Sequence, residues 1–408
     1  MKQLIKLAWR NIWRNRRRTF LTLLAIAFGL GLTVFTRGIQ FGTYELTIDY
    51  NVSLSAGHVQ IHRAGYWDKK TLQNTFEEDK VDFDAIADLP HVMGVSPRLT
   101  VDGLVAVGEE HTSGARIHGV VPEREDAISI VPQNMIDGDW LLDGKHAVIG
   151  KVLAKNLKAS VGDTLVYFTQ GRYGETAAGL FKISGIYSVG EQDMDGYMVF
   201  VPLHLLQPQV SADNRLSALV IRVDDHRAVA DLAMHLRQLF PSDQWEVMDY
   251  EALMPGLMQT IAFDDASGVV FLILLIVVIG FGILETILMS VMERFHEFGV
   301  MMALGMGRMR IGGLIFFEAL FLGLIGSLLG NVLGYGTNVW FQNNPIHFGD
   351  EMGDAYREFG FVPKLIALPD LHEQLIWTAV VLGLTLAVAM WPARVAMQFR
   401  PVEAIRQV

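Results

Sequence analysis

The sequence lacks cysteine altogether and is poor in charge. Among its 408 residues there is no Cys, and only 19% are Asp, Glu, Lys or Arg. Without thiols the chain can form no disulfide, no thiolate metal site and no lipid-anchored cysteine. The absence leaves the redox compartment open, because cysteine usage is the feature that would indicate it.

Nucleotide, hydrolase and metal motifs are also missing. The sequence has no G-x-x-x-x-G-K-[ST] loop, no G-x-S-x-G elbow, and no lysine in its glycine cluster at 305–313. His58 and His62 lie four residues apart in a predicted strand, about 13 Å along one face, which is too far for two ligands of one ion. We therefore expect no catalytic residue, metal or cofactor on this chain.

What the chain has in quantity is apolar sequence. Hydrophobic residues make up 51% of it, and its mean hydropathy of +0.31 is too high for a typical soluble protein and too low for membrane spans alone. Residues 269–292 are almost wholly apolar and as a helix would measure about 36 Å, enough to cross a bilayer. The predicted spans are 19–41, 268–292, 312–341 and 372–391.

A water-soluble domain is predicted between the first two spans, at residues 44–265. This region has no run of 18 apolar residues. It has short alternating stretches instead, at 58–62, 104–108, 164–168, 197–201 and 218–223. Residues 225–240 show helical spacing of apolar residues. The sequence therefore predicts an integral membrane protein with four transmembrane α-helices and a large α+β extracytoplasmic domain between helices 1 and 2.

The distribution of charge predicts the orientation. Residues 1–18 contain seven basic residues and no acid, whereas residues 41–267 contain 17 basic and 33 acidic residues. The positive-inside rule places residues 1–18, a basic amphipathic helix, in the cytoplasm and the acidic domain outside. We expect this basic segment to contact anionic lipid rather than nucleic acid, because a span follows it directly. The first apolar run is longer than a signal-peptide core, which favours an uncleaved span.

Three polar segments carry the clearest motifs. Residues 293–311 are amphipathic and predict an interfacial element, although an ordinary polar loop would have the same charge spacing. Their sequence, ERFHEFGVMMALGMGRMRI, resembles the E-R-x-x-E-I-G-x-x-x-A-L-G-A signature of the MacB-like, FtsX-like and lipoprotein-releasing ABC transporter permeases. The opening pattern of that family resembles Ala8, Arg10, Asn11, Arg14, Arg17, Arg18 and Thr19 here. Its C-terminal pattern resembles Pro392, Ala393, Ala396, Pro401, Ala404 and Arg406 in the tail at 392–408, with Ile405 in place of Leu.

The resemblance implies a location and partners. It implies a multi-pass protein of the bacterial inner membrane with both termini cytoplasmic, a cytoplasmic ABC ATPase dimer, a second permease copy or paralogue, and a periplasmic carrier or adaptor. In the family this cytoplasmic element couples the ATPase to the spans. The matching residues are Glu293, Arg294, Glu297, Gly299, Ala303, Leu304 and Gly305. The resemblance also implies a porter-like lobe with a β lobe inserted at about 120–210, and gives the external loop at 342–371 no role.

Some residues within the spans have their own predicted roles. Gly326, Gly330 and Gly334 are spaced by four and predict a helix-packing face, the alternative being glycines that are merely tolerated in a membrane helix. Glu285 and Glu318 are costly in lipid, so each is expected to reach water at the interface or to be held by helix partners. The family often has an acid at the position of Glu318 but not at that of Glu285, which implies that Glu318 is a shared structural group.

The implied mechanism is mechanical. Closure of the ATPase dimer would move the spans and swing the external domain, and the domain would then push lipoprotein or other lipidated cargo. Residues 55–70 favour this cargo because they resemble the lipoprotein-releasing branch. The alternatives are MacB-like efflux of peptides or antibiotics through an adaptor and an outer-membrane duct, and FtsX-like signalling to a cell-wall hydrolase. The large external domain argues against signalling.

Overall fold

The computed structural model describes residues 2–349, 352–353, 356 and 362–399. The remainder of the predicted tail and of the predicted loop at 342–371 lies outside the described residues. The chain divides into two compact units. The helical unit comprises Met1–Tyr44, Thr260–His347 and Lys364–Val408, and the inserted domain comprises Glu45–Gln259 and Phe348–Pro363.

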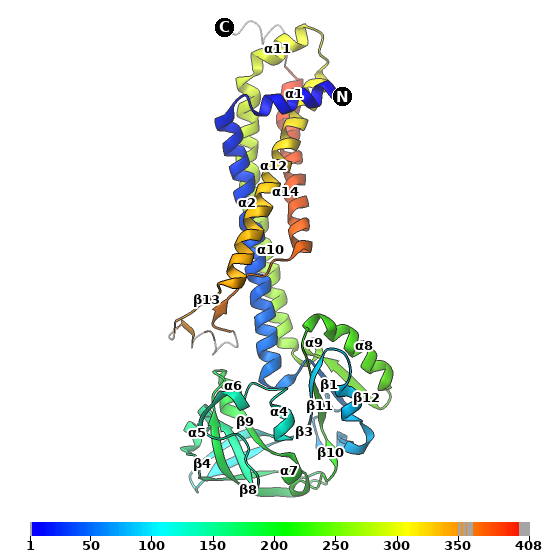
Figure 1. The fold of residues 1–408 in the computed structure, drawn as a ribbon, viewed down its shortest axis with the longest axis vertical. Helices are drawn as coiled ribbons and strands as arrows, with labels where there is room; N and C mark the ends of the chain where they lie inside the picture. Colours follow the sequence, from blue (N-terminus) through cyan, green and yellow to red (C-terminus); the bar gives the residue numbers. More distant parts are fainter. Residues whose placement is uncertain (1, 350–351, 354–355, 357–361, 400–408) are drawn as a thin grey trace. The chain divides into compact units, whose positions relative to one another are not determined.

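The described chain has four helices long and apolar enough to cross a bilayer (Figure 1). They are α2 (Arg16–Asn51), α10 (Pro255–Glu293), α12 (Arg308–Asn343) and α14 (Leu371–Met397). Together with the domain inserted after the first of them, they confirm the predicted fold class. Each helix extends beyond its predicted span. The 39 residues of α10 would measure about 58 Å, roughly twice the hydrocarbon thickness, so part of this helix must lie in a polar environment.

Two short helices lie at one end of the helical unit (Figure 1). They are α1 (Lys2–Ile12) and α11 (Phe295–Ala303). The α1 helix packs against α12, where the ring of Trp9 lies edge-on to Phe321 with centroids 5.3 Å apart. Its buried side chains are Ala8 and Ile12. The predicted basic helix is therefore amphipathic, with one face on the bundle.

The three predicted packing glycines of α12 face α2. A Cβ atom on Gly326, Gly330 or Gly334 would lie 2.7, 2.9 or 2.7 Å from atoms of Ile26, Ala27 or Val34, respectively. Ordinary carbon contacts are longer than these, so only glycine allows the two backbones to approach this closely. The side-chain amide of Asn338 donates to the carbonyl of Val34 at 3.1 Å and extends the contact by one turn.

The inserted domain is built on one ten-stranded sheet. Its strands are β1 (Val59–Arg63), β3 (Val92–Val107), β4 (His111–Val120), β5 (Met135–Gly138), β6 (His146–Gly150), β7 (Thr164–Gln170), β8 (Thr176–Tyr187), β9 (Met198–Pro202), β11 (Ala218–Val223) and β12 (Trp245–Asp249). The five predicted alternating stretches lie in β1, β3, β7, β9 and β11, and the predicted helix is α8 (Val229–Leu239). A shorter pair in this domain is β2 (Phe76–Glu77) with β10 (Arg215–Leu216), whereas the pair of β13 (Ile346–His347) with β14 (Lys364–Leu365) belongs to the helical unit.

The remaining helices of the inserted domain are short and connect its strands. They are α3 (Phe83–Ala87), α4 (Pro122–Glu125), α5 (Lys151–Leu157), α6 (Gln192–Tyr197), α7 (Leu203–Gln209) and α9 (Tyr250–Leu253). The longer α8 packs against β12. Contacts between residues that lie far apart in the sequence are made mainly by the strand pairs of the sheet.

Strand β3 joins two parts of this sheet. Its first half pairs with β11, whereas residues 103–106 pair with β7, and β4 pairs along residues 98–107. Because β7 also pairs with β8, the strands β3, β4, β9, β6, β8 and β7 close into a ring. The expected lobe at about 120–210 therefore does not stand apart. Its ring needs β3 and β4, and β4 runs through Gly119 without a break, since Gly119 is in register with both Leu99 and Val201.

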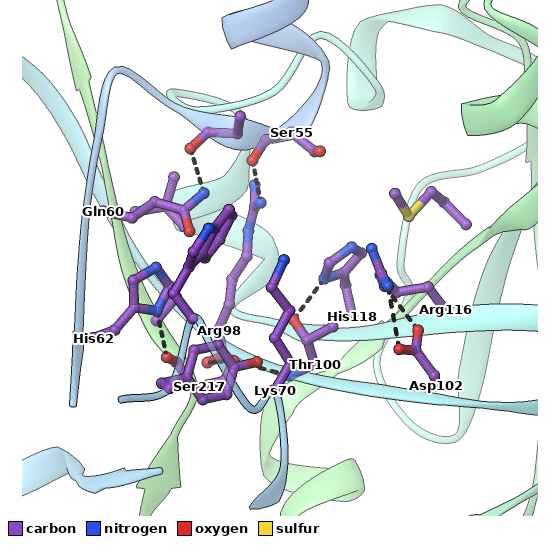
Figure 2. Close-up of a pocket in the computed structure, with 16 residues that line it drawn as sticks. Ser55, Gln60, His62, Lys70, Arg98, Thr100, Asp102, Arg116, His118 and Ser217 are labelled. Atoms are coloured by element: carbon purple, nitrogen blue, oxygen red, sulfur yellow. Dashed lines mark hydrogen bonds and ion pairs between the residues drawn. The ribbon is translucent and has the colours of Figure 1, made fainter. Parts of the chain in front are cut away.

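Side-chain alternation gives the sheet an apolar face and a polar face. Ile61, Leu99 and Ile117 point into the main core and are at most 1% exposed. Their neighbours His62, Thr100 and His118 point to the opposite face. There they line a pocket with residues of a loop and of the turn that precedes β1 (Figure 2).

The glycine contact predicts the effect of one added methyl group. Gly330→Ala should lower the free energy of unfolding by about 1–3 kcal/mol, because the new Cβ must displace backbone of α2. Gly336→Ala is the matched control on the same helix, since a Cβ there meets no atom within 4 Å. Thermal unfolding of the full chain in detergent compares the two. Equal stability of both variants would contradict the contact.

Candidate functional site

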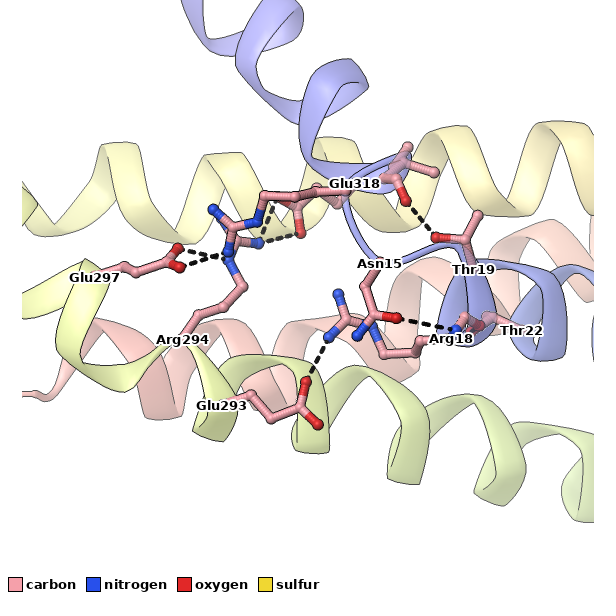
Figure 3. A network of polar contacts seen from close by, with 10 residues as sticks. Asn15, Arg18, Thr19, Thr22, Glu293, Arg294, Glu297 and Glu318 are labelled. Carbon is pink, nitrogen blue, oxygen red and sulfur yellow. Dashed lines mark hydrogen bonds and ion pairs between the residues drawn. The ribbon is translucent and has the colours of Figure 1, made fainter.

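Arg294 lies where α10 ends and α11 begins, and its side chain is 7% exposed. One guanidinium nitrogen, Nη1, donates to both carboxylate oxygens of Glu318 on α12, at 2.9 and 3.0 Å. Its Nε donates to Glu297 on α11 at 3.3 Å (Figure 3). The guanidinium carbon lies 4.9 Å from the ring centroid of the fully buried Phe298. The side chain of Arg294 therefore ties α11 to α12.

The N-terminal segment adds three contacts to the same cluster. The amide of Asn11, on α1, donates to Glu318 at 2.7 Å. Arg14, between α1 and α2, binds Glu297 at 2.5 Å, and Arg18, on α2, binds Glu293 at 3.0 Å. We call these seven side chains the polar hub: Asn11, Arg14, Arg18, Glu293, Arg294, Glu297 and Glu318. The hub connects α1, α2, α10, α11 and α12.

Glu318 is held by partners within the bundle. Of its two expected environments, water and helix partners, the structure shows the second, with only 12% of the side chain exposed. Its carboxylate accepts from Arg294 and from Asn11. A buried carboxylate needs such partners, because one left unpaired would be strongly destabilising.

The charge of Glu297 is set by its two arginines. Partial burial raises the pKa of its carboxyl group, but hydrogen bonds and charges of Arg14 and Arg294 outweigh this, so the pKa lies below its ordinary value. The group is therefore ionised at neutral pH. The stability it contributes is fully present above the unfolded-state pKa, and it is lost only as the pH falls through the lowered value.

The α11 helix ends in a turn that depends on Gly305. Its φ of 94° is left-handed, its amide donates to Met302, and the amide of Met306 donates to Met301. This is the Schellman arrangement, in which glycine avoids the strain of a Cβ. Leu304, beside it, is 84% exposed, and Met309, at the start of α12, is 80% exposed. The turn therefore presents apolar side chains to its surroundings.

The seven predicted coupling residues thus fall into two groups. Glu293, Arg294 and Glu297 belong to the polar hub, and Gly299 is buried behind it. The other three, Ala303, Leu304 and Gly305, lie exposed at the turn. We call residues 303–309 the exposed turn. Sequence order alone does not separate the two groups, because the α11 helix directs one face inward and its last turn outward.

Glu285 does not join the hub. It lies on α10 with its side chain exposed, and it makes no hydrogen bond or ion pair with the described residues. Within the described residues no group of three or more His, Asp or Glu is arranged to hold a metal ion. The chemistry available at the hub is that of ion pairs, which hold the helices together.

A second polar cluster was not predicted. Arg37, on α2, is 5% exposed and binds Asp265 on α10 at 2.7 Å and Glu373 on α14 at 3.1 Å. Its Nη1 also donates to Gln40. The signal that could have found it is a lone arginine directly after an apolar run, since a buried charge there needs partners. Asn11 and Arg14 were noted only as part of a motif.

Comparison with known proteins agrees with this architecture. A model of the MacB-like periplasmic core domain matches residues 19–239, and a model of the FtsX-like permease C-terminal region matches residues 269–399. Transmembrane protein LolC of the lipoprotein-releasing system of Xylella fastidiosa is 24% identical, over 78% of each chain. The uncharacterized ABC transporter permease YknZ of Bacillus subtilis is 22% identical over 98% of each chain.

Other matches are partial. The macrolide export ATP-binding/permease protein MacB of Escherichia coli is 21% identical over 84% of this chain and 53% of its own length. The chain thus spans about half the length of the MacB relatives it matches. The crystal structure of the periplasmic region of MacB from Actinobacillus actinomycetemcomitans covers 50% of this chain and 94% of that one, with 14% identity and a TM-score of 0.36.

Four membrane helices with a domain inserted after the first define a multi-pass membrane protein. The chain belongs to the family of ABC transporter permeases that combine a MacB-like periplasmic core domain with an FtsX-like C-terminal region. The resemblance inferred from the motifs is confirmed.

The hub predicts a large effect of removing one charge. Glu318→Gln should lower the free energy of unfolding by about 3–5 kcal/mol, because it leaves the buried Arg294 with only the longer contact to the partly exposed Glu297. Glu293→Gln breaks a pair whose acid is 45% exposed and should cost about 0–1 kcal/mol. Chemical unfolding of the full chain in detergent measures both. Similar losses in the two variants would argue against a special role for the buried pair.

Proposed function

We propose that this chain is the membrane subunit of an ATP-driven pump that works by mechanotransmission. ATP and Mg²⁺ are bound by a separate cytoplasmic ATPase dimer, and this chain carries no cofactor. The proposal is supported by the family, by the lack of a phosphate-binding loop in the sequence, and by the MacB relatives, whose name combines an ATP-binding part with a permease. The second permease in the assembly is another copy of this chain or a paralogue.

The single observation that carries the proposal is the polar hub behind the exposed turn. An ATPase that binds Leu304 and Met309 displaces α11, because both residues are exposed and Leu304 directly follows the last residue of α11. Arg294 then passes the displacement to Glu318 on α12, and Glu297 passes it to Arg14, in the connection between α1 and α2. Ion pairs at buried positions suit this role because they resist separation.

The second cluster holds the other ends of the helices in register. Arg37 links α2, α10 and α14 through Asp265 and Glu373. Between the two clusters, the glycine face of α12 packs on α2. A displacement applied at the hub therefore moves α2, α10 and α12 together, and α2 and α10 are the helices that lead into and out of the inserted domain.

Lipidated cargo is the first candidate. The supporting observations are the LolC relative, matched over 78% of its length, and the resemblance of residues 55–70 to the lipoprotein-releasing branch. In this proposal the inserted domain moves cargo that leaves the outer leaflet of the inner membrane. Efflux of peptides or antibiotics with an adaptor is the second candidate, favoured by the MacB relative matched over 84% of this chain.

The orientation predicts which sites a membrane-impermeant thiol reagent reaches. The chain has no cysteine, so single substitutions report without background. Lys155→Cys, exposed on α5 of the inserted domain, should react from outside spheroplasts, and Ala303→Cys, in the exposed turn, should react only after lysis. The opposite pattern would invert the topology and exclude an ATPase at the exposed turn.

Two variants distinguish docking from transmission. Leu304→Asp should prevent copurification of the partner ATPase, whereas Leu304→Met should retain it, because only the first changes the apolar character of the exposed turn. Glu297→Lys should keep the ATPase bound but reduce the stimulation of ATP hydrolysis by cargo about tenfold or more, since a lysine repels both Arg14 and Arg294.

The assay uses proteoliposomes with a purified lipoprotein in one arm and a periplasmic adaptor in the other. Stimulation by lipoprotein alone supports the first candidate, and stimulation by adaptor alone supports the second. Unaltered coupling in Glu297→Lys would show that force does not pass through the hub. Thermal unfolding serves as the control that both variants remain folded.

A further inference from the structure

The polar face of the inserted domain holds a pocket that the transport mechanism does not use. Its floor consists of alternate residues of neighbouring strands, because every second side chain of a strand points to the same face. Thr100 is in register with His118, and Asp102 is in register with Arg116. Arg98, on β3, is in register with Ala218 in β11, and Gln60, on the same face of β1 as His62, is in register with Val220 in β11.

Two segments near β1 cover this floor. The turn at Val52–Ala56, a short π-helix before β1, contributes Ser55 and Ala56, and the loop after β1 contributes Tyr66, Trp67 and Lys70 (Figure 2). The Ser55 carbonyl accepts from Arg98, and the Ala56 carbonyl accepts from Gln60 at 2.6 Å. Residues 55–70, singled out in the sequence, thus build the pocket wall. Residues 55–70 have no part in the proposed coupling, and in the structure they line this pocket.

The pocket is positively charged within an acidic domain. Its lining contains three cations, Lys70, Arg98 and Arg116, and one acid, Asp102, which leaves a formal charge of +2. Two of these cations are compensated, because Arg116 binds Asp102 at 2.7 Å and Arg98 binds the fully buried Glu125. Lys70 has no acidic partner among the described residues. Its ammonium lies 3.5 Å from the ring centroid of Trp67.

Two buried histidines in the lining each have an unsatisfied nitrogen. His62 is 1% exposed and His118 is 7% exposed, and the Nε2 atom of each has no hydrogen-bond partner among the described residues. Their other ring nitrogens are engaged, since Nδ1 of His62 lies 2.8 Å from the Ser217 carbonyl and Nδ1 of His118 lies 2.9 Å from the Thr100 hydroxyl. Buried polar atoms are nearly always paired, so these two indicate a polar occupant.

We propose that this pocket binds a small oxyanion group of phosphate size, carried either by a free anion or by a phospholipid head group. A volume of about 210 Å³ is below the roughly 300–1,000 Å³ of sites for drug-sized ligands, so only a single group fits. Lys70 supplies the uncompensated charge at the rim, and His62 and His118 supply ring nitrogens at the floor. The site is independent of the proposed coupling, and failure of one leaves the other standing.

Binding to this site takes up a proton. Nδ1 of His62 faces a carbonyl and must carry the ring hydrogen, so Nε2 donates to an oxyanion only when the ring is protonated. The pKa of His62 is lowered to about 4. Burial is the main cause, the hydrogen bond to Ser217 acts in the opposite direction, and the positive charge of Lys70 lowers the pKa further. Burial lowers the pKa of His118 as well, assisted by Arg98 and Arg116. The ring of Tyr66 stacks on that of His62, with centroids 5.0 Å apart.

An anion in the pocket raises these histidine pKa values above those of the empty pocket. The bound state therefore holds more protons, so affinity rises as the pH falls and declines as the pH rises. Sulfate isolates this effect, because its own charge stays constant across the range tested.

The test is calorimetric titration of the full chain in detergent with sodium sulfate, inorganic phosphate and glycerol 3-phosphate. We expect saturable sulfate binding that is about fivefold tighter at about pH 5 than at about pH 7. Lys70→Ala should weaken it about tenfold or more, as for loss of one charge-assisted hydrogen bond, whereas Lys69→Ala, its exposed neighbour outside the lining, should not. His62→Asn retains a donor to the Ser217 carbonyl, lacks Nε2, and should weaken the pH dependence.

The outcomes separate the sources of the group. Tighter binding of glycerol 3-phosphate than of inorganic phosphate indicates a head group, and equal or weaker binding indicates a free anion. No saturable heat with any of the three probes overturns the site. Equal losses in Lys70→Ala and Lys69→Ala also overturn it, because they would reflect surface charge alone.

Discussion

The guanidinium of Arg294 is the contact on which the organisation of the helical unit depends. It is buried where α10 gives way to α11, and it is paired with Glu318 in the middle of a different helix. Once such a charge is out of water, its loss of hydration must be offset by its partner, so neither residue is replaceable alone. The more exposed pairs, Arg14 with Glu297 and Arg18 with Glu293, contribute less stability, each about 0–1 kcal/mol, but they fix the N-terminal segment on the same point.

Between its polar ends the bundle is held by shape rather than charge. Gly326, Gly330 and Gly334 allow α12 to pack closely against α2. A bilayer provides no hydrophobic force between helices that would compensate for a poorer fit. Arg37 closes the arrangement beyond this contact with two acids from α10 and α14. Because closely packed helices do not slide easily past one another, a small displacement of α11 would also move the helices that it contacts. This rigidity is what the proposed coupling to a separate ATPase would require.

Much of this could be predicted from patterns in the sequence, and the misses have physical causes. Apolar runs and alternation gave the spans and strands, because both periods are local properties. The partner of Glu318 was not predicted, since Arg294 lies 24 positions away and pairs with it only across two packed helices. Arg37 was overlooked for the same reason. The sequence pattern also does not show that the ring containing strands of the expected lobe at about 120–210 includes β3 and β4, because that depends on strand pairing.

The sequence by itself determined the class of molecule, because span length, charge asymmetry and short motifs act through nearest neighbours and through the bilayer. It also predicted a coupling element in the segment at 293–305. Only the tertiary structure decided which residues of this segment are buried and which are exposed. Arg294 is buried and paired with Glu318, whereas Leu304 is exposed. The same holds for the pocket around His62 and His118, whose lining draws on five strands that meet only through register, which no single stretch of sequence specifies.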